Sequence, residues 1–195
     1  MKRNSPLKNL HQTGLYGNYK NQNENDLLVI REITNLKIFQ IVQYKSSILN
    51  IDSLKLDGLS FPVHAGFVEA SDTTRVQWNA PNTWIIISSN ENIIDDIIKN
   101  FHENDFAITD QSHSRAIIQI EGKKALDVIK KGSPLNLNDF KKNNCANSIY
   151  HGITISIDML DDDLNKFNIM ALRSFTGSFH HAITDAALEF GYKGL

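Results

Sequence analysis

The pattern of apolar and polar residues predicts short strands through the first half of the chain. Five segments are rich in β-branched and aromatic residues, which favours strands: 27–32, 36–43, 75–79, 84–88 and 106–110. Ala80-Pro81-Asn82 separates the third segment from the fourth. A short connection that contains proline and asparagine predicts that these two strands form a hairpin.

Two helices are predicted among these strands. Ile48, Ile51 and Leu54 recur at helical spacing within residues 46–57. Ser88 and Glu91 form the S-x-x-E pattern of a capping box, which marks the start of a second helix. Its apolar face is then formed by Ile93, Ile94, Ile97, Ile98 and Phe101.

The second half of the chain has a similar order of elements. Alternation predicts strands in three segments: 116–121, 153–159 and 167–173. A helix follows Gly122, and Gly132 with Pro134 is expected to end it. A last helix carries apolar residues from Phe179 to Phe190, with Gly191 beyond its end.

The order of elements predicts an α+β fold made of two related, ferredoxin-like β-α-β-β-α halves. Residues 1–26 are expected to form a polar N-terminal arm, because residues 18–26 offer little to bury. The first half is assigned to 27–112 and the second to 113–195, closely packed as one unit. Residues 106–137 connect the two halves.

Composition and charge exclude several classes of function. The formal net charge of −2 provides no long-range attraction to nucleic acid or to an anionic membrane. No apolar run has the length of a membrane-spanning helix, and the N-terminus lacks the apolar core of a secretory signal. The single cysteine, Cys145, excludes an internal disulfide framework. We therefore expect a cytoplasmic protein that binds neither nucleic acid nor membranes.

Ser112-His113-Ser114-Arg115 is the segment that most resembles an active site. Neighbouring residues of a strand face opposite ways, so a hydroxyl and an imidazole that are adjacent in sequence need not meet. The G-x-S-x-G pattern of a nucleophile elbow is also missing. We therefore interpret the segment as a polar turn between two strands rather than as a nucleophile with its base.

Other candidate residues also favour structural roles. His180 and His181 are adjacent on a helix and so point about 100° apart, which makes them poor joint metal ligands. The carboxylates of 161–163 lack the spacing of a calcium loop and are interpreted as a solvated turn. Gly122, which precedes two lysines at a helix start, is a weak candidate for anion binding.

Trp78 and Trp84 are expected in a core or an interface rather than in base stacking, and Cys145 is expected as a small buried apolar residue. From the residues alone, the chain is a partner or structural protein. We assign no catalytic, cofactor-binding or metal-binding residue.

Two segments, taken in this order, resemble a known family. These are Trp78-x-x-Pro81-x-x-Trp84 and Lys131-Gly132-Ser133-Pro134-Leu135-x-Leu137. Shorter matching pieces are Ser5-Pro6-Leu7, Asp110-x-Ser112, the strand from Arg115 to Gly122, Phe140, Cys145-Ala146 and Arg173-Ser174-Phe175. Together they resemble the gamma subunit of heterotetrameric sarcosine oxidase.

The resemblance implies a compact relative of the aminomethyltransferase (glycine-cleavage T protein) fold. It also implies a complex with alpha, beta and delta subunits that oxidatively demethylates sarcosine to glycine. That complex passes the one-carbon unit to tetrahydrofolate and electrons to oxygen. FAD, FMN, NAD, tetrahydrofolate and zinc are expected on the partner subunits, and this chain is expected to support assembly without catalysing the reaction.

Aminomethyltransferases carry a folate-facing aspartate soon after the strand that corresponds to residues 84–88. Here that strand continues into Ser88-Ser89-Asn90-Glu91, and Asp95 and Asp96 belong to the predicted helix, so no such residue is assigned. Two alternatives therefore stay open. One is a stand-alone folate-dependent enzyme of the aminomethyltransferase type, and the other is a subunit or assembly module of a related N-methyl amino acid dehydrogenase.

Overall fold

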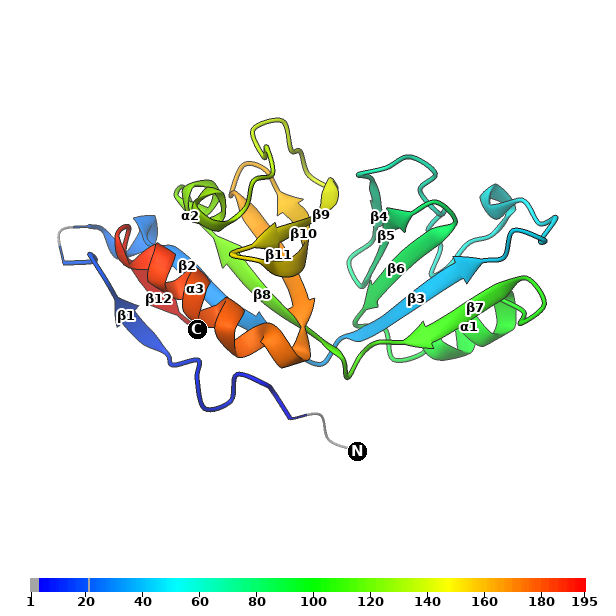
Figure 1. The fold of residues 1–195 in the computed structure, drawn as a ribbon, viewed down its shortest axis with the longest axis horizontal. Coiled ribbons are helices and arrows are strands. Elements are labelled where there is room, and N and C mark those ends of the chain that lie inside the picture. The colour runs from blue at the N-terminus through cyan, green and yellow to red at the C-terminus, as the bar shows by residue number, and fades with distance from the viewer. Residues whose placement is uncertain (1–3, 21) are drawn as a thin grey trace. The chain divides into compact units, whose positions relative to one another are not determined.

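A computed structural model of the chain describes residues 4–20 and 22–195. It divides into two compact units (Figure 1). We call Asn35–His113 the central unit. We call the other unit, Met1–Thr34 with Ser114–Leu195, the terminal unit.

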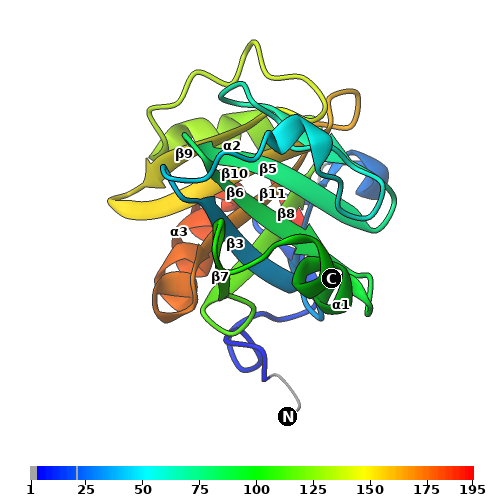
Figure 2. The same cartoon turned by 90° about the vertical axis from the view of Figure 1, so that its right-hand side faces the viewer.

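The central unit is built on a five-stranded antiparallel sheet in the order β4-β5-β6-β3-β7. Its strands are β3 (Lys37–Gln43), β4 (Val68–Ala70), β5 (Thr74–Ala80), β6 (Thr83–Ser88) and β7 (Phe106–Asp110). Helix α1 (Ile93–Asn100) and the short 3-10 helix η2 (Ile51–Ser53) lie in front of these strands in Figure 2. Their apolar side chains share one core with the sheet, which includes Phe61, Trp84, Ile86 and Phe101.

The terminal unit is built on a seven-stranded sheet in the order β1-β12-β2-β8-β11-β10-β9. Its strands are β1 (Gly14–Tyr16), β2 (Leu28–Ile33), β8 (Arg115–Glu121), β9 (Cys145–Tyr150), β10 (Ile153–Asp161), β11 (Lys166–Leu172) and β12 (Tyr192–Gly194). The pairs are antiparallel except for β12 with β2, which is parallel. Two short 3-10 helices, η1 (Glu24–Asp26) and η3 (Arg173–Phe175), complete the connections.

Helices α2 (Ala125–Gly132) and α3 (Thr176–Leu188) cover one face of the seven-stranded sheet. Alternate strand residues such as Ile118, Ile157 and Ile169 form one core with the buried faces of both helices. Phe179 on α3 is fully buried. The predicted α+β class is thereby confirmed.

The division into units differs from the one that the sequence predicted, and we correct it here. Residues 27–34 were assigned to the first half, but β2 pairs with β8 and β12 in the terminal unit. Part of the arm predicted at 1–26 also joins this sheet, because Gly14–Tyr16 pairs with Tyr192–Gly194. Local sequence patterns do not predict which distant strands pair, because every strand edge offers the same backbone hydrogen-bonding groups. Close packing of the predicted halves as one unit stays a prediction.

The helix predicted over 46–57 is wrong. Only Ile51–Ser53 forms a turn of 3-10 helix, while Ile48 is 99% exposed. Ile51 and Leu54 do pack against the core, as does the fully buried Leu56. An irregular segment can therefore bury apolar residues at helical spacing without forming a helix.

The predicted capping box is also wrong. Ser88 is the last residue of β6, and its hydroxyl accepts a hydrogen bond from the backbone N–H of Asn90 at 3.0 Å. Helix α1 begins at Ile93, with Asn92 as its N-cap. The hydroxyl therefore shapes the turn after the strand and does not cap the helix, a competition between local hydrogen bonds that is common for serine.

The segment 131–137 connects α2 to the rest of the terminal unit. The Lys131 ammonium group donates to the Ala186 carbonyl at 2.7 Å and to the Glu189 carboxylate at 2.6 Å, both at the end of α3. The Ser133 hydroxyl is 2.9 Å from that of Ser148 on β9, and Leu137 is buried in the core. This segment fixes the two helices and the edge strand together.

Within the described parts of the chain, no helix has the length and apolar composition needed to cross a lipid bilayer.

Candidate functional site

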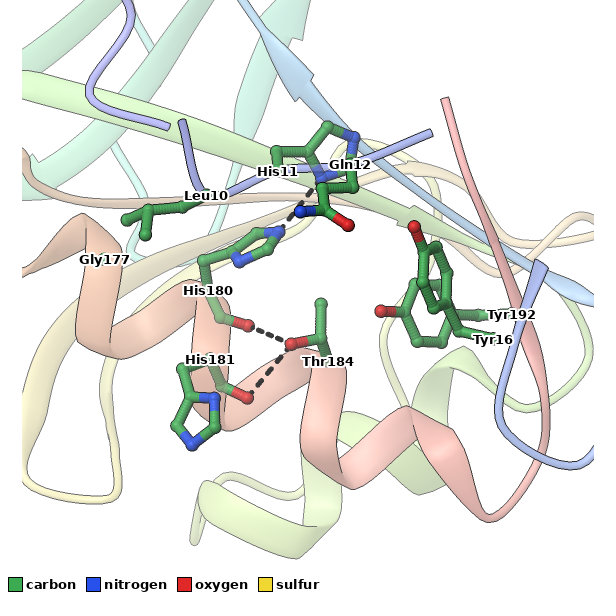
Figure 3. Close-up of a pocket in the computed structure, with 9 residues that line it drawn as sticks. All are labelled: Leu10, His11, Gln12, Tyr16, Gly177, His180, His181, Thr184 and Tyr192. Carbon is green, nitrogen blue, oxygen red and sulfur yellow. Dashed lines mark hydrogen bonds between the residues drawn. The ribbon is translucent and has the colours of Figure 1, made fainter. Parts of the chain in front are cut away.

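A cavity of about 200 Å³ lies beside helix α3 in the terminal unit, and we call it the histidine pocket (Figure 3). Two parts of the chain that are far apart in sequence form it: residues 10–16 on one side, and α3 with β12 on the other. Its lining residues are Leu10, His11, Gln12, Tyr16, Gly177, His180, His181, Thr184 and Tyr192.

Two histidines form a hydrogen-bonded pair in this pocket. Nδ1 of His11 lies 3.0 Å from Nε2 of His180, and Nε2 of His11 lies 2.7 Å from the main-chain oxygen of Leu195. A main-chain oxygen accepts hydrogen bonds, so Nε2 of His11 carries a hydrogen. In neutral His11 the Nδ1 atom is then the acceptor, and His180 donates to it through its own Nε2–H.

The environment of His180 keeps its imidazole neutral at physiological pH. The pKa of His180 is lowered to about 4, mainly by burial, and the neighbouring His11 and His181 contribute in the same direction. His181, the next residue of the helix, is exposed and points to another side in Figure 3, as helical geometry predicts. The two adjacent histidines therefore do not converge on one point.

The other side of the histidine pocket is formed by hydroxyl groups. The rings of Tyr16 and Tyr192 stack with their centroids 5.1 Å apart. The Thr184 hydroxyl donates to the carbonyl oxygens of His180 and His181, at 2.8 and 3.1 Å. Since these groups bind one another, the pocket is a satisfied polar contact between the N-terminal segment and α3.

A second hollow, of about 300 Å³, lies in the central unit, and we call it the loop groove. Most of its lining comes from the irregular segment between η2 and β4. The lining residues are Asp52, Ser60, Phe61, Pro62, Val63, His64, Phe67 and Glu69. It combines apolar side chains with two carboxylates, and sequence reasoning missed it because this segment shows no periodicity.

The structure places Ser112 in a structural role. Its side chain is buried, and its hydroxyl oxygen accepts a hydrogen bond from the N–H of Ile38 on β3 at 2.9 Å. The backbone N–H of Ser112 donates to the Asp110 carboxylate at 2.8 Å. Burial raises the pKa of Asp110, but hydrogen bonds from the side chain and backbone of Ser112, together with the charges of His113 and Lys37, lower it by more, so the net pKa is below its ordinary value. The hydroxyl thus closes the end of the central sheet and is not presented to a substrate.

Replacing Ser112 by alanine is expected to lower the free energy of unfolding by about 1–3 kcal/mol, because the buried N–H of Ile38 loses its acceptor. Urea unfolding followed by circular dichroism measures the change. Ser46→Ala, at an exposed serine of the same unit, is the matched control and should be close to neutral. Unchanged stability of Ser112→Ala together with loss of enzymatic activity would instead indicate a catalytic hydroxyl.

The remaining candidates are accounted for by contacts within the chain. Lys123 and Lys124, which follow Gly122, form ion pairs with Asp26 and Asp127 at 2.6 and 2.9 Å. The Asp161 carboxylate accepts from the N–H of Leu164 in the turn between β10 and β11.

Trp84 and Cys145 are both buried, as expected of apolar residues. The Trp84 indole N–H donates to the carbonyl oxygen of Pro62 at 2.8 Å. Trp78 lies opposite Trp84 in the β5–β6 hairpin. The two tryptophans therefore belong to the framework of the central unit.

Asp57 forms a hydrogen-bonded cluster that the sequence did not reveal. Its carboxylate accepts from the hydroxyls of Thr74 and Thr73 and from the Asn90 side-chain amide. The Thr74 hydrogen bond is the main reason that the pKa of Asp57 lies below its ordinary value. This carboxylate joins the turn at Gly58 to two strand ends, and its acceptor capacity is used within the chain.

Across residues 4–20 and 22–195, no three histidine, cysteine, aspartate or glutamate side chains come together as ligands for a metal ion. In the histidine pocket, His11 and His180 bind each other, and the Thr184 hydroxyl binds carbonyl oxygens of its own helix.

Comparison with known proteins identifies both a family and a fold. Residues 50–189 match the family described as sarcosine oxidase, gamma subunit family. The comparison with curated protein sequences finds no match.

The solved structures that resemble this fold include the following two. Heterotetrameric sarcosine oxidase from Corynebacterium sp. U-96, in complex with pyrrole 2-carboxylate, contains a chain that superposes with a TM-score of 0.80 at 21% identity. The match covers 96% of both chains. The glycine cleavage system aminomethyltransferase T from Bartonella henselae has a TM-score of 0.54 at 12% identity. That match covers 80% of this chain but only 45% of the aminomethyltransferase.

Proposed function

The chain belongs to the sarcosine oxidase gamma subunit family, and from this membership we propose that it supports the assembly of an oxidoreductase complex without catalysing the reaction. The complex is a heterotetrameric sarcosine oxidase with alpha, beta and delta subunits as its partners. It demethylates sarcosine oxidatively to glycine and transfers the one-carbon unit to tetrahydrofolate.

The observation that carries this proposal is the family match, which includes residues of both structural units. The side chains considered as catalytic add support, because their polar groups are engaged inside the chain. Ser112 closes a sheet end, and His180 bonds to His11. Such groups stabilise a fold and leave the chemistry to other chains.

The proposal places FAD, FMN, NAD, tetrahydrofolate and zinc on the partner subunits. Neither a Walker loop nor a G-x-G-x-x-G motif occurs in the sequence, so this chain lacks the usual signatures of nucleotide binding. The proposal also places the complex in the cytoplasm, where the single thiol of Cys145 would stay reduced.

Co-expression with the three partner subunits tests this function. An affinity tag on this chain is expected to co-purify all three partners in equal amounts, with sarcosine oxidation in the purified fraction. Omitting this chain should reduce the yield of active complex, because a subunit that binds only the folded assembly stabilises it by mass action. Elution of this chain as a separate monomer, with full activity in the remaining subunits, would contradict the proposal.

The fold likeness to an aminomethyltransferase gives a second candidate, a stand-alone folate-dependent enzyme. Titration of the isolated chain with tetrahydrofolate, followed by fluorescence, separates the two. The assembly function predicts no saturable binding. Saturable binding that is lost on changing one acidic residue would favour the enzyme.

A further inference from the structure

We infer that the loop groove of the central unit is the surface through which this chain docks onto a partner subunit. The segment that it receives carries an apolar side chain next to a lysine or arginine. This inference rests on the proposed function, since it assumes that the chain has partner subunits. It adds which surface makes the contact and what chemistry the partner presents.

The groove exposes large apolar side chains that the fold of the central unit leaves uncovered. Val63 is 52% exposed and Phe67 is 54% exposed, and both line the groove. Their neighbour Phe61 is only 3% exposed and forms part of the core. Exposed apolar side chains that gather around a hollow are typical of interaction surfaces, whereas single exposed apolar residues are common on any protein.

The groove is held in shape by the core below it. The Phe61 ring packs edge-on against Trp84, with centroids 5.4 Å apart, and contacts the Phe101 ring at 5.3 Å. The Trp84 indole N–H donates to the carbonyl oxygen of Pro62 at 2.8 Å. At the other end of the segment, the backbone N–H of Trp78 donates to the carbonyl oxygen of Phe67 at 3.1 Å.

These contacts give the W-x-x-P-x-x-W segment a specific task. The Trp84 side chain holds the backbone at Pro62, the main-chain N–H of residue 78 holds it at Phe67, and the turn at Pro81 places the two tryptophans opposite each other. Residues 62–67 are therefore fixed at both ends although they form no helix or strand. A preformed surface loses little conformational entropy on binding, which favours docking.

The charges around the groove define the partner. Two of its eight lining residues, Asp52 and Glu69, carry carboxylates, and none is a lysine or an arginine. Both carboxylates are on exposed residues. An incoming apolar side chain would fill the space between Phe61, Val63 and Phe67, and a neighbouring cation would lie near the carboxylates. Opposite charges around an apolar contact mainly determine which partner binds and how it is oriented.

The test uses the tagged chain and the complete set of partner subunits. Phe67→Ala is expected to weaken binding of the partner subunits about 10- to 30-fold, as truncation of a central aromatic residue typically does. Glu69→Lys should also weaken binding, because it places a like charge against the partner's cation. Affinity is measured by titrating each purified variant onto immobilised partner subunits.

Two matched controls lie outside the groove in the same unit. Ile98→Ala removes another exposed apolar side chain, on α1, and Glu103→Lys reverses another exposed acidic residue. Both should bind like the wild type. Melting temperatures of all four variants are compared so that a folding defect is not taken for a docking defect, and Phe67→Tyr, which keeps the ring, should restore most of the binding.

Each outcome has a distinct meaning. If the wild-type chain assembles and Phe67→Ala and Glu69→Lys bind equally well, the docking surface is wrong while the proposed function stands. If the wild-type chain itself does not assemble, the proposed function fails first. If the isolated chain forms a dimer that Phe67→Ala dissociates, the groove receives a second copy of this chain and the inferred partner is wrong.

Discussion

Replacing Gly132 by alanine is expected to lower the free energy of unfolding by about 2–3 kcal/mol, because the added methyl group would overfill the core of the terminal unit. A Cβ atom at this position would lie 2.6 Å from Cε1 and Cζ of the Tyr150 ring. The ring cannot move aside easily, because Tyr150 is fully buried and its hydroxyl donates to the carbonyl oxygen of Val128 at 3.0 Å.

Urea unfolding of Gly132→Ala, followed by circular dichroism, measures this loss. Gly177→Ala is the matched control, since it also adds a methyl group to a glycine in a helix. There the new Cβ would meet only the end of the flexible Leu10 side chain, at 3.1 Å. We expect this control to be nearly neutral, since alanine favours helix formation over glycine. Equal free energies of unfolding for the two variants would show that the core around Tyr150 has room for the added methyl group.

Lowering the pH from 6.5 to 4 is expected to destabilise the terminal unit by about 3 kcal/mol through His180. Burial, assisted by His11 and His181, lowers the pKa of His180 from 6.5 to about 4 in the folded chain. Between pH 6.5 and 4, His180 is therefore mostly protonated in the unfolded chain and mostly neutral in the folded chain. Stability falls throughout this window and levels off once the pH drops below the folded pKa.

Melting temperatures measured between pH 7.5 and 4.5 test this dependence. His180→Gln keeps a side chain that can donate to His11 but removes the titration, so its melting temperature should change much less over the window. His181→Gln, at the exposed neighbour, should behave like the wild type. The carboxylates of Asp26, Asp57 and Asp110, whose pKa is lowered, lose their stabilising effect only as the pH falls below about 3.8, and that of Glu24 only below about 4.5, which is the acid end of the window. A wild-type slope that persists in His180→Gln would contradict this account.

Helix α2 and the β5–β6 hairpin were predictable because local signals agreed with the tertiary structure. The helix runs from Ala125 to Gly132, as the apolar spacing and the following Pro134 indicated. The turn of the hairpin places Asn82 at a φ of 55°, a conformation that asparagine tolerates better than most residues. The sequence predicted Gly132 as the residue that ends this helix. In the structure a glycine is needed there because the residue lies close to Tyr150, and its φ is not positive.

The irregular parts of the chain were not predictable in the same way. Residues 46–57 have the apolar spacing of a helix, yet their backbone follows the surface of the core that Phe61 and Trp84 form. The loop groove depends on where that segment ends and on which strands hold it. Two of its anchors, the N–H groups of Trp78 and Trp84, belong to residues that the sequence indicated only as framework.

The sequence by itself determined the α+β class, the positions of most strands and helices, and the motifs that identify the family. Each of these depends on contacts between residues that are near in sequence, or on residue types at fixed spacing. Only the tertiary structure decided that β2 joins the sheet of the terminal unit, that His11 meets His180, and that the two tryptophans hold a groove. These contacts join residues distant along the chain, and their selection depends on the packing of the whole unit rather than on any local preference.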